Sequence, residues 1–295
     1  MTELLQTVVR GLGNGSIYAL LALGFVIIYK SMRVISFAQP SLMVAGAVLV
    51  TYLVGPIGFY AAVFLAALGI AALALGVERT AIRPLLGRPI FVIAIVTIGV
   101  DIVIRVVVNG FIGLDVRQVG DPWGLRTISI GSVVIQQRYL AMMATTLVLV
   151  AALFAFFRYT RLGLAMRAAS YDQEAALAQG VSVSLVFATS WALAGALAAI
   201  AGAFVGTGAG IDQQTWIIAF KALPAIILGG LDSLEGAVVG GLAVGLVESL
   251  VATYQPDLAP WLGQNFAVVS PYVLMLLVLL VRPYGLFGTP EVERV

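Results

Sequence analysis

The amino-acid sequence predicts an all-α polytopic membrane protein, folded as a single transmembrane domain over residues 1–295. Hydrophobic residues make up 61% of the chain and charged residues 10%, whereas a soluble domain is roughly half apolar and about a quarter charged. The mean hydropathy is +1.08. The apolar residues also gather in runs near the length of about 20 residues that crosses a bilayer as a helix. We therefore expect about eight or nine crossings, with some segments broken or re-entrant.

The apolar runs of the first half have clear boundaries. The first run is too long for a signal-peptide core and ends at Lys30 and Arg33, so it is predicted to be a span. Gly55 and Pro56 turn the chain after the second run, and a basic loop at 78–88 follows the third. An external loop at 112–138 contains an alternating stretch, 127–135, that is typical of a small hairpin. The predicted spans are residues 11–29, 41–54, 59–77, 89–111 and 139–157.

The second half repeats this pattern with more small residues. The run at 182–208 is rich in alanine and glycine, which allow close approach of helices in lipid. The segment 216–230 is short and contains Pro224, so it either crosses the membrane or is re-entrant. A span at 236–252, a proline-containing loop at 254–264 and a last span at 266–281 complete the chain. Tight helix packing also explains the glycines of this half, which are Gly229, Gly230, Gly236, Gly240, Gly241 and Gly245.

The polar segment 34–40 interrupts the apolar pattern before the second span. Pro40 and its polar neighbours leave that span short unless the segment itself packs into the membrane as a broken half-helix. Irregular backbone survives at membrane depth only against protein or a water-filled cavity. An ordinary tight turn at the membrane surface is the alternative, and the sequence does not decide between them.

Basic residues predict the sides of the membrane, because cytoplasmic loops carry an excess of lysine and arginine. If segment 158–181 is cytoplasmic, ten basic residues lie inside and four outside, which predicts an external N-terminus and a cytoplasmic C-terminus. The inside set is Lys30, Arg33, Arg79, Arg83, Arg88, Arg158, Arg161, Arg167, Arg282 and Arg294. The outside set is Arg10, Arg117, Arg126 and Arg138.

The composition argues against several classes of function. The chain has no cysteine and no histidine, so disulfides, thiolate chemistry and histidine-based catalysis or metal binding are excluded. No GxxxxGK[ST] motif is present, so the chain has no Walker A nucleotide site of its own. No basic run for nucleic acid occurs, and no pattern supports an intramembrane enzyme.

A few polar side chains fall within the spans. Asp101 and Arg105 lie four residues apart, so they share a helix face and can pair. They are either a polar lining or gate of a substrate path, or a neutralised structural ion pair. Glu248 has no partner nearby in the sequence and fits either role. Small polar residues near the broken segments are further path candidates, because transporters place substrate contacts there. These are Asn14, Ser16, Ser36, Gln39, Ser41 and Thr97.

Segment 158–181 is a long polar interruption. It begins with basic residues, continues with Asp172, Gln173 and Glu174, and closes at Gly180, a plausible helix stop. We expect a short amphipathic helix suited to docking in a partner's groove, and a solvated connecting loop is the alternative.

Several segments together resemble one family. Glu174-Ala175-Ala176, followed after three residues by Gly180, resembles the cytoplasmic EAA loop of bacterial ABC-importer permeases. Gly15-Ser-Ile-Tyr-Ala-Leu-Leu-Ala-Leu-Gly24 resembles the first span of the branched-chain amino acid (Liv-type, H-subunit) permeases, and Ile35-Ser-Phe-Ala-Gln-Pro40 is similar to their Asn-Phe-Ala-His-Gly signature. Further matches are Thr160-Arg-Leu-Gly-Leu-Ala-Met-Arg-Ala168, Phe220-Lys-Ala through Leu228-Gly-Gly-Leu-Asp-Ser233 to Gly236-Ala237, and Arg282-Pro-Tyr-Gly-Leu-Phe-Gly288. The resemblance covers residues 11–288.

The resemblance implies a non-catalytic permease of the bacterial cell (inner) membrane. Such a permease pairs with a second homologous permease and two cytoplasmic ATP-binding subunits, and a periplasmic or extracellular binding protein delivers the substrate. ATP and magnesium bind the partner subunits, and this chain carries no cofactor. The family moves leucine, isoleucine and valine, while relatives move urea, short amides and other small solutes. The residues implied in coupling to an ATP-binding subunit are Ala168, Ala169, Asp172, Gln173, Glu174, Ala175, Ala176 and Gly180.

Two departures from the family pattern leave the exact substrate open. Gln39 and Pro40 stand where the family commonly has His-Gly, and the charges of Asp101 and Arg105 lie where uncharged residues are expected. Two other classes of protein remain as alternatives. One is an ion-coupled secondary transporter that uses Asp101, Arg105 and Glu248, and the other is a membrane scaffold that transports nothing.

Overall fold

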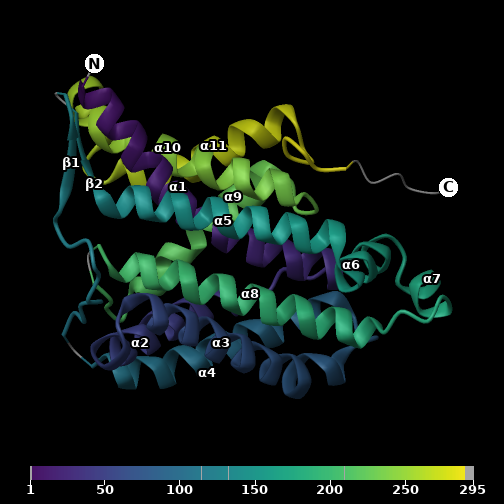
Figure 1. Ribbon diagram of the computed structural model, residues 1–295. Helices are drawn as coiled ribbons and strands as arrows, with labels where there is room; N and C mark the ends of the chain where they lie inside the picture. Colours follow the sequence, from purple (N-terminus) through teal and green to yellow (C-terminus); the bar gives the residue numbers. More distant parts are fainter. Residues whose placement is uncertain (1, 114, 132, 209, 290–295) are drawn as a thin grey trace. The chain divides into compact units, whose positions relative to one another are not determined.

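The computed structural model describes residues 2–113, 115–131, 133–208 and 210–289 (Figure 1). The chain folds as two compact units, each assembled from separate stretches of sequence. Unit 1 takes the described residues of Met1–Val26, Trp123–Thr146 and Phe220–Val295, and unit 2 takes those of Ile27–Pro122 and Leu147–Ala219.

Helices account for most of the described chain, which confirms the all-α polytopic class. Among the described residues, 7 helical segments are long and apolar enough to cross a membrane. They are α1 (Thr2–Met32), α2 (Gln39–Ile57), α3 (Phe59–Val77, continued to Leu85), α4 (Ile90–Ile112), α5 (Gln137–Tyr159), α8 (Val183–Gly206) and α10 (Leu234–Leu258). Two shorter apolar segments accompany them, Thr215–Gly229, which contains the 3-10 helix η3 (Thr215–Lys221) and α9 (Ala222–Gly229), and α11 (Phe266–Val281).

In unit 2, α8 packs against α2 and α3, and α4 packs against α2 (Figure 1). Small residues permit this close approach. A Cβ atom added at Gly46 of α2 would lie 2.4 Å from the Cα of Ala199 in α8, and one added at Gly202 would lie 2.1 Å from the carbonyl oxygen of Met43. Any larger side chain at these glycines would force the helix backbones apart, so the alanine and glycine content of α8 sets the spacing of this unit.

In unit 1, α10 packs against α1, α9 and α11. Gly241 and Gly245 of α10 face α1, where an added Cβ at Gly245 would lie 2.3 Å from the Cα of Gly15. On another side of α10, an added Cβ at Gly240 would lie 2.1 Å from the carbonyl oxygen of Ala225 in α9. The expectation of tight helix packing is confirmed for Gly229, Gly236, Gly240, Gly241 and Gly245, whereas Gly230 caps the end of α9 with a φ of +109° and lies against Gly288.

The predicted hairpin is also present. Strands β1 (Thr127–Ile130) and β2 (Val133–Gln136) pair antiparallel, with Thr127 opposite Gln136 and Ile130 opposite Val133. The strands belong to unit 1 and lead directly into α5.

Four predicted boundaries were wrong. The first helix begins at Thr2, well before the predicted span at 11–29. Residues 78–85 are not a loop but continue α3 as a π-turn, η1 (Glu78–Ile82), and a 3-10 turn, η2 (Arg83–Leu85). The predicted loop at 254–264 is largely helical, because Pro256 lies in the last turn of α10, where a proline disturbs only the helix end, and η4 (Pro260–Leu262) follows. The second span is longer than predicted, because Pro40 lies in the first turn of α2, where its missing N–H does not break the helix.

Candidate functional site

The polar stretch after α5 forms two short helices, α6 (Arg161–Tyr171) and α7 (Gln173–Ala178). Asp172 separates them and caps α7, since its Oδ1 accepts a hydrogen bond of 2.9 Å from the N–H of Ala175. Gly180 ends the segment with a φ of +82°, a left-handed conformation that glycine adopts without strain. The helical interpretation of this stretch is therefore supported over that of an irregular loop.

The two helices have distinct faces. The predicted coupling residues Ala169 and Ala176 are buried, as are Gly163 and Met166, so these side chains face the bundle. The exposed predicted residues are Ala168, Asp172, Glu174, Ala175 and Gly180. Sequence reasoning missed four exposed apolar side chains beside them, Leu162 (37% exposed), Leu164 (60%), Tyr171 (90%) and Leu177 (56%). Exposed apolar side chains thus stand among the exposed charges of α6 and α7. Their presence within a charged stretch was the available signal.

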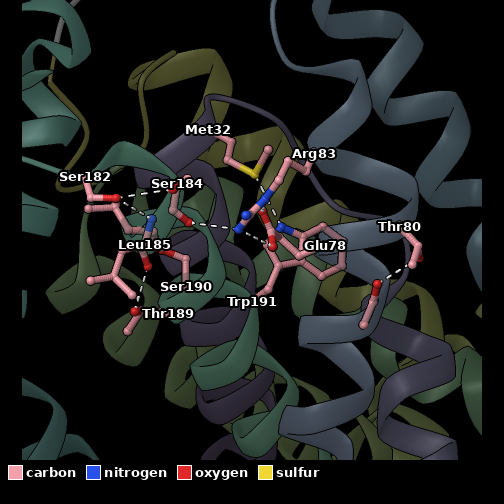
Figure 2. A network of polar contacts seen from close by, with 12 residues as sticks. Met32, Glu78, Thr80, Arg83, Ser182, Ser184, Leu185, Thr189, Ser190 and Trp191 are labelled. Atoms are coloured by element: carbon pink, nitrogen blue, oxygen red, sulfur yellow. Dashed lines mark hydrogen bonds and ion pairs between the residues drawn. The ribbon is translucent and has the colours of Figure 1, made fainter.

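The end of α1 is tied to this segment. The Nε2 amide of Gln173 donates a hydrogen bond of 2.9 Å to the carbonyl oxygen of Ser31, and Arg33 donates one of 3.2 Å to the carbonyl oxygen of Ser170. Arg33 has a φ of +56°, which is uncommon for a side chain of its size. The indole N–H of Trp191 in α8 contacts the sulfur of Met32 at 3.3 Å (Figure 2). Movement of α6 and α7 would thus act directly on the end of α1.

The segment between α1 and α2 lies against the middle of α4. Its Val34, Ser36 and Ala38 are buried. The N–H of Phe37 donates a hydrogen bond of 3.0 Å to the hydroxyl of Thr97, which belongs to α4. This irregular backbone is thus supported by protein, as such backbone requires wherever it lies within a membrane. The broken segment at membrane depth stays a prediction.

Asp101 accepts a hydrogen bond from the first turn of α2. Its Oδ1 accepts a hydrogen bond of 3.0 Å from the N–H of Ser41 in the first helical turn, and its Oδ2 accepts one of 2.5 Å from Arg105. A carboxylate at a helix N-terminus is stabilised by unpaired N–H groups and by the helix dipole. The guanidinium of Arg105 also stacks 4.0 Å from the ring centroid of Trp216. With each group engaged in this way, the geometry favours the structural ion pair over a gate.

Two other predicted path residues have a buried oxygen atom that accepts no hydrogen bond from the described residues. The hydroxyl oxygen of Ser36 and the Oε1 of Gln39 are buried and have no hydrogen-bond partner among the described residues. The Nε2 of Gln39 donates a hydrogen bond of 3.1 Å to the carbonyl oxygen of Ala194 in α8, which fixes the amide in place. A buried acceptor without a partner is costly, so water or a polar solute at this position would stabilise the segment.

In unit 1, Glu248 has partners that are distant in sequence. Its carboxylate accepts a hydrogen bond of 2.5 Å from the ammonium of Lys221 and one of 2.7 Å from the hydroxyl of Tyr18. The hydroxyl of Ser16, in contrast, donates within its own helix to the carbonyl oxygen of Leu12, and Asn14 is half-buried. Among the path candidates of unit 1, Glu248 is therefore the one whose side chain lies in a cluster of polar groups.

Comparison with known proteins decides the family. Residues 7–279 match the family model described as "Branched-chain amino acid transport system / permease component". The chain belongs to this permease family. The high-affinity branched-chain amino acid transport permease LivH of Salmonella typhimurium (strain LT2) is 30% identical, over 99% of this chain and 97% of the relative. The corresponding permease BraD of Pseudomonas aeruginosa is also 30% identical, over 99% of this chain and 98% of the relative.

A more distant relative and a solved structure extend the comparison. The probable LivH of Methanocaldococcus jannaschii is 27% identical over 92% of this permease and 89% of the relative. A structure described as PsaBC from Streptococcus pneumoniae in complex with Fab matches with a TM-score of 0.53 and 13% identity, covering 95% of this permease and 91% of that chain. At this identity the match supports the fold alone.

The permease contains a further charged pair that sequence reasoning missed. The guanidinium of Arg83 donates two hydrogen bonds of 3.0 Å, one to each carboxylate oxygen of Glu78 (Figure 2). The π-turn explains the pairing, because the N–H of Arg83 also bonds to the carbonyl oxygen of Glu78, which brings residues five apart together. The available signal was an acidic residue directly after an apolar run and five positions before an arginine.

Proposed function

We propose that this permease is the membrane-spanning subunit of an ATP-driven ABC importer that carries branched-chain amino acids or a related small solute into the cell. The observation that carries the proposal is similarity along nearly the whole chain to permeases named for branched-chain amino acid transport. The polar cluster around Glu248 supports a transport role, because ionisable side chains in a bilayer are rare and usually functional.

The proposed assembly contains a second homologous permease, two cytoplasmic ATP-binding subunits and a substrate-binding protein, within membrane lipid and without nucleic acid. ATP and magnesium bind the ATP-binding subunits, and this chain needs no cofactor. The lack of a Walker A motif supports this division of labour. The exposed face of α6 and α7 has both charged and apolar side chains, which suits a docking surface on an ATP-binding subunit.

The proposed location is the bacterial cell (inner) membrane, with the N-terminus outside and the C-terminus in the cytoplasm. The excess of basic residues in the segments predicted to be cytoplasmic supports this orientation. Arg294, which belongs to the predicted cytoplasmic set, lies outside the described residues.

The proposed mechanism couples two conformations of the permease to ATP binding on its partners. Closure of the ATP-binding subunits would move α6 and α7, and the hydrogen bond from Gln173 to the carbonyl of Ser31 would pass that movement to the end of α1. The irregular segment that contains Ser36 comes directly after α1 in the chain. ATP and substrate must bind the inward-open and outward-open states with different affinities for this to drive transport.

A pull-down from native membranes tests the proposal. The tagged wild-type permease should co-purify with ATP-binding subunits, and Glu174→Arg should lose them, because it reverses an exposed charge on α7. Asp115→Arg is the matched control, since it makes the same change at an exposed acid in the predicted external loop and should retain the subunits. Purification of the permease alone, with amino-acid uptake intact and abolished by an ionophore, would contradict the proposal and favour an ion-coupled carrier.

A further inference from the structure

Unit 1 contains a cluster of polar groups drawn from separate helical segments. Tyr18 belongs to α1, Lys221 ends η3 and precedes α9, and Glu248 belongs to α10. The ammonium of Lys221 lies 2.5 Å from one carboxylate oxygen of Glu248, and the hydroxyl of Tyr18 lies 2.7 Å from the other. The ammonium also lies 5.9 Å from the centroid of the Tyr18 ring. Cation, anion and hydroxyl thus form one connected group.

The cluster lies near the midpoints of the two spanning helices that contribute to it. Tyr18 and Glu248 are each within about two residues of the midpoint of a spanning helix, α1 and α10 respectively. Lys221 stands where the 3-10 helix η3 changes to the α-helix α9, a change of helix type within the apolar helical segment Thr215–Gly229. Transporters tend to place substrate contacts at irregular helical segments near the midplane.

The pair of Lys221 and Glu248 differs from two other ion pairs of the described chain. Asp101 with Arg105 and Glu78 with Arg83 are each local in sequence. In both of those pairs, one member also bonds to backbone, Asp101 to an N–H and Arg83 to a carbonyl oxygen.

The ammonium of Lys221, by contrast, has three donors and one hydrogen-bonded acceptor among the described residues. The side chains of Lys221 and Glu248 remain 15% and 16% exposed, so neither is fully enclosed by the described chain. A buried ion pair is also weak evidence for a purely stabilising role.

We propose that Lys221, Glu248 and Tyr18 bind the α-carboxylate and α-ammonium groups of the transported amino acid. The inference rests on the proposed function and specifies its substrate class as a zwitterion. The α-ammonium replaces Lys221 on the carboxylate of Glu248, while Lys221 and the hydroxyl of Tyr18 donate to the α-carboxylate. Every charge keeps an opposite partner during this exchange, so the permease never holds an isolated charge in an apolar bundle. Uncharged solutes such as amides would leave the original pair closed.

The test measures initial uptake of radiolabelled L-leucine by the assembled transporter in cells, divided by the amount of permease in the membrane. The double variant Lys221→Met/Glu248→Gln removes both charges and leaves neither unpaired. We expect its uptake to fall at least ten-fold, while the ATP-binding subunits still co-purify with it. The matched control Glu78→Met/Arg83→Met removes another buried pair, and its uptake per molecule should stay within two-fold of wild type.

The charge-swapped variant Lys221→Glu/Glu248→Lys keeps an ion pair and serves if the neutral variant fails to accumulate. It should remain in the membrane but transport leucine at least ten-fold more slowly. The positive and negative side chains have exchanged places, so each would face the substrate group of like charge. Uptake within two-fold of wild type in either double variant would mean that the pair is structural, and would overturn this inference while leaving the proposed function intact. Absence of branched-chain amino acid uptake by the wild-type transporter would overturn both.

Discussion

Replacement of Arg83 by methionine should destabilise the permease strongly, because it leaves a carboxylate buried without its partner. Glu78 is 0% exposed, and both of its oxygens accept hydrogen bonds of 3.0 Å from the same guanidinium (Figure 2). Arg83 also lies 3.4 Å from the carbonyl oxygen of Ser184, at the start of α8. The substitution preserves an apolar stem of similar reach and removes only the charged donors.

The expected loss of unfolding free energy follows from how deeply each member of the pair is buried. Removal of one partner of a buried ion pair costs about 3–5 kcal/mol, and a hydrogen bond to a charged group contributes about 1.5–3 kcal/mol. The side chain of Arg83 is 37% exposed, so water reaches that end of the pair and moderates the loss. We therefore expect the lower end of that range for Arg83→Met, about 3 kcal/mol. The double variant Glu78→Met/Arg83→Met should recover to within about 1 kcal/mol of wild type, since an apolar pair replaces an ionic one.

The assay is reversible unfolding of the purified permease in mixed micelles, followed by circular dichroism, with a double-mutant cycle over the two positions. Arg79→Met is the control, because it removes the same charge from an exposed neighbour and should change the unfolding free energy by less than about 0.5 kcal/mol. The reasoning is refuted if Arg83→Met is as stable as this control. A double variant as unstable as the single one would show that lost packing, rather than an unpaired carboxylate, is responsible.

Three further predictions concern helix packing, the start of α2 and coupling. Gly245→Ala should destabilise the permease by about 1–3 kcal/mol in the same assay, because its Cβ would lie 2.3 Å from the facing backbone of α1, whereas Gly99→Ala, in open space, should not destabilise it. Asp101→Asn should lower stability by about 2 kcal/mol by leaving Arg105 without its carboxylate, while leucine uptake per molecule stays unchanged; a selective loss of uptake would instead assign the residue to the path. Gln173→Leu should keep ATP hydrolysis by the assembled transporter and lower the leucine transported per ATP several-fold, since its hydrogen bond to the end of α1 is lost; an unchanged ratio would contradict this coupling route.

Periodicity and motifs were sufficient for the elements of the fold. Apolar runs located every long helix, because a helix in lipid must satisfy its backbone internally and present an apolar surface, and both requirements act on contiguous sequence. The predicted span at 59–77 coincides with α3, and the last span at 266–281 coincides with α11. The hairpin at 127–135 followed from alternation alone. Local rules failed where a proline stood in the terminal turn of a helix, as at Pro40 and Pro256.

The sequence by itself thus determined the class of protein, its spans, its amphipathic polar segment and the resemblance that led to its family. The tertiary structure decided which polar groups meet. Asp101 and Arg105 could be paired by spacing, but the contact of Asp101 with the start of α2 could not, and Glu248 had no local partner at all. Its contacts with Lys221 and Tyr18 span 27 and 230 residues of sequence. Such contacts depend on how helices pack side by side. Glycines and alanines set this packing, but their positions in the sequence do not indicate which helix each one faces.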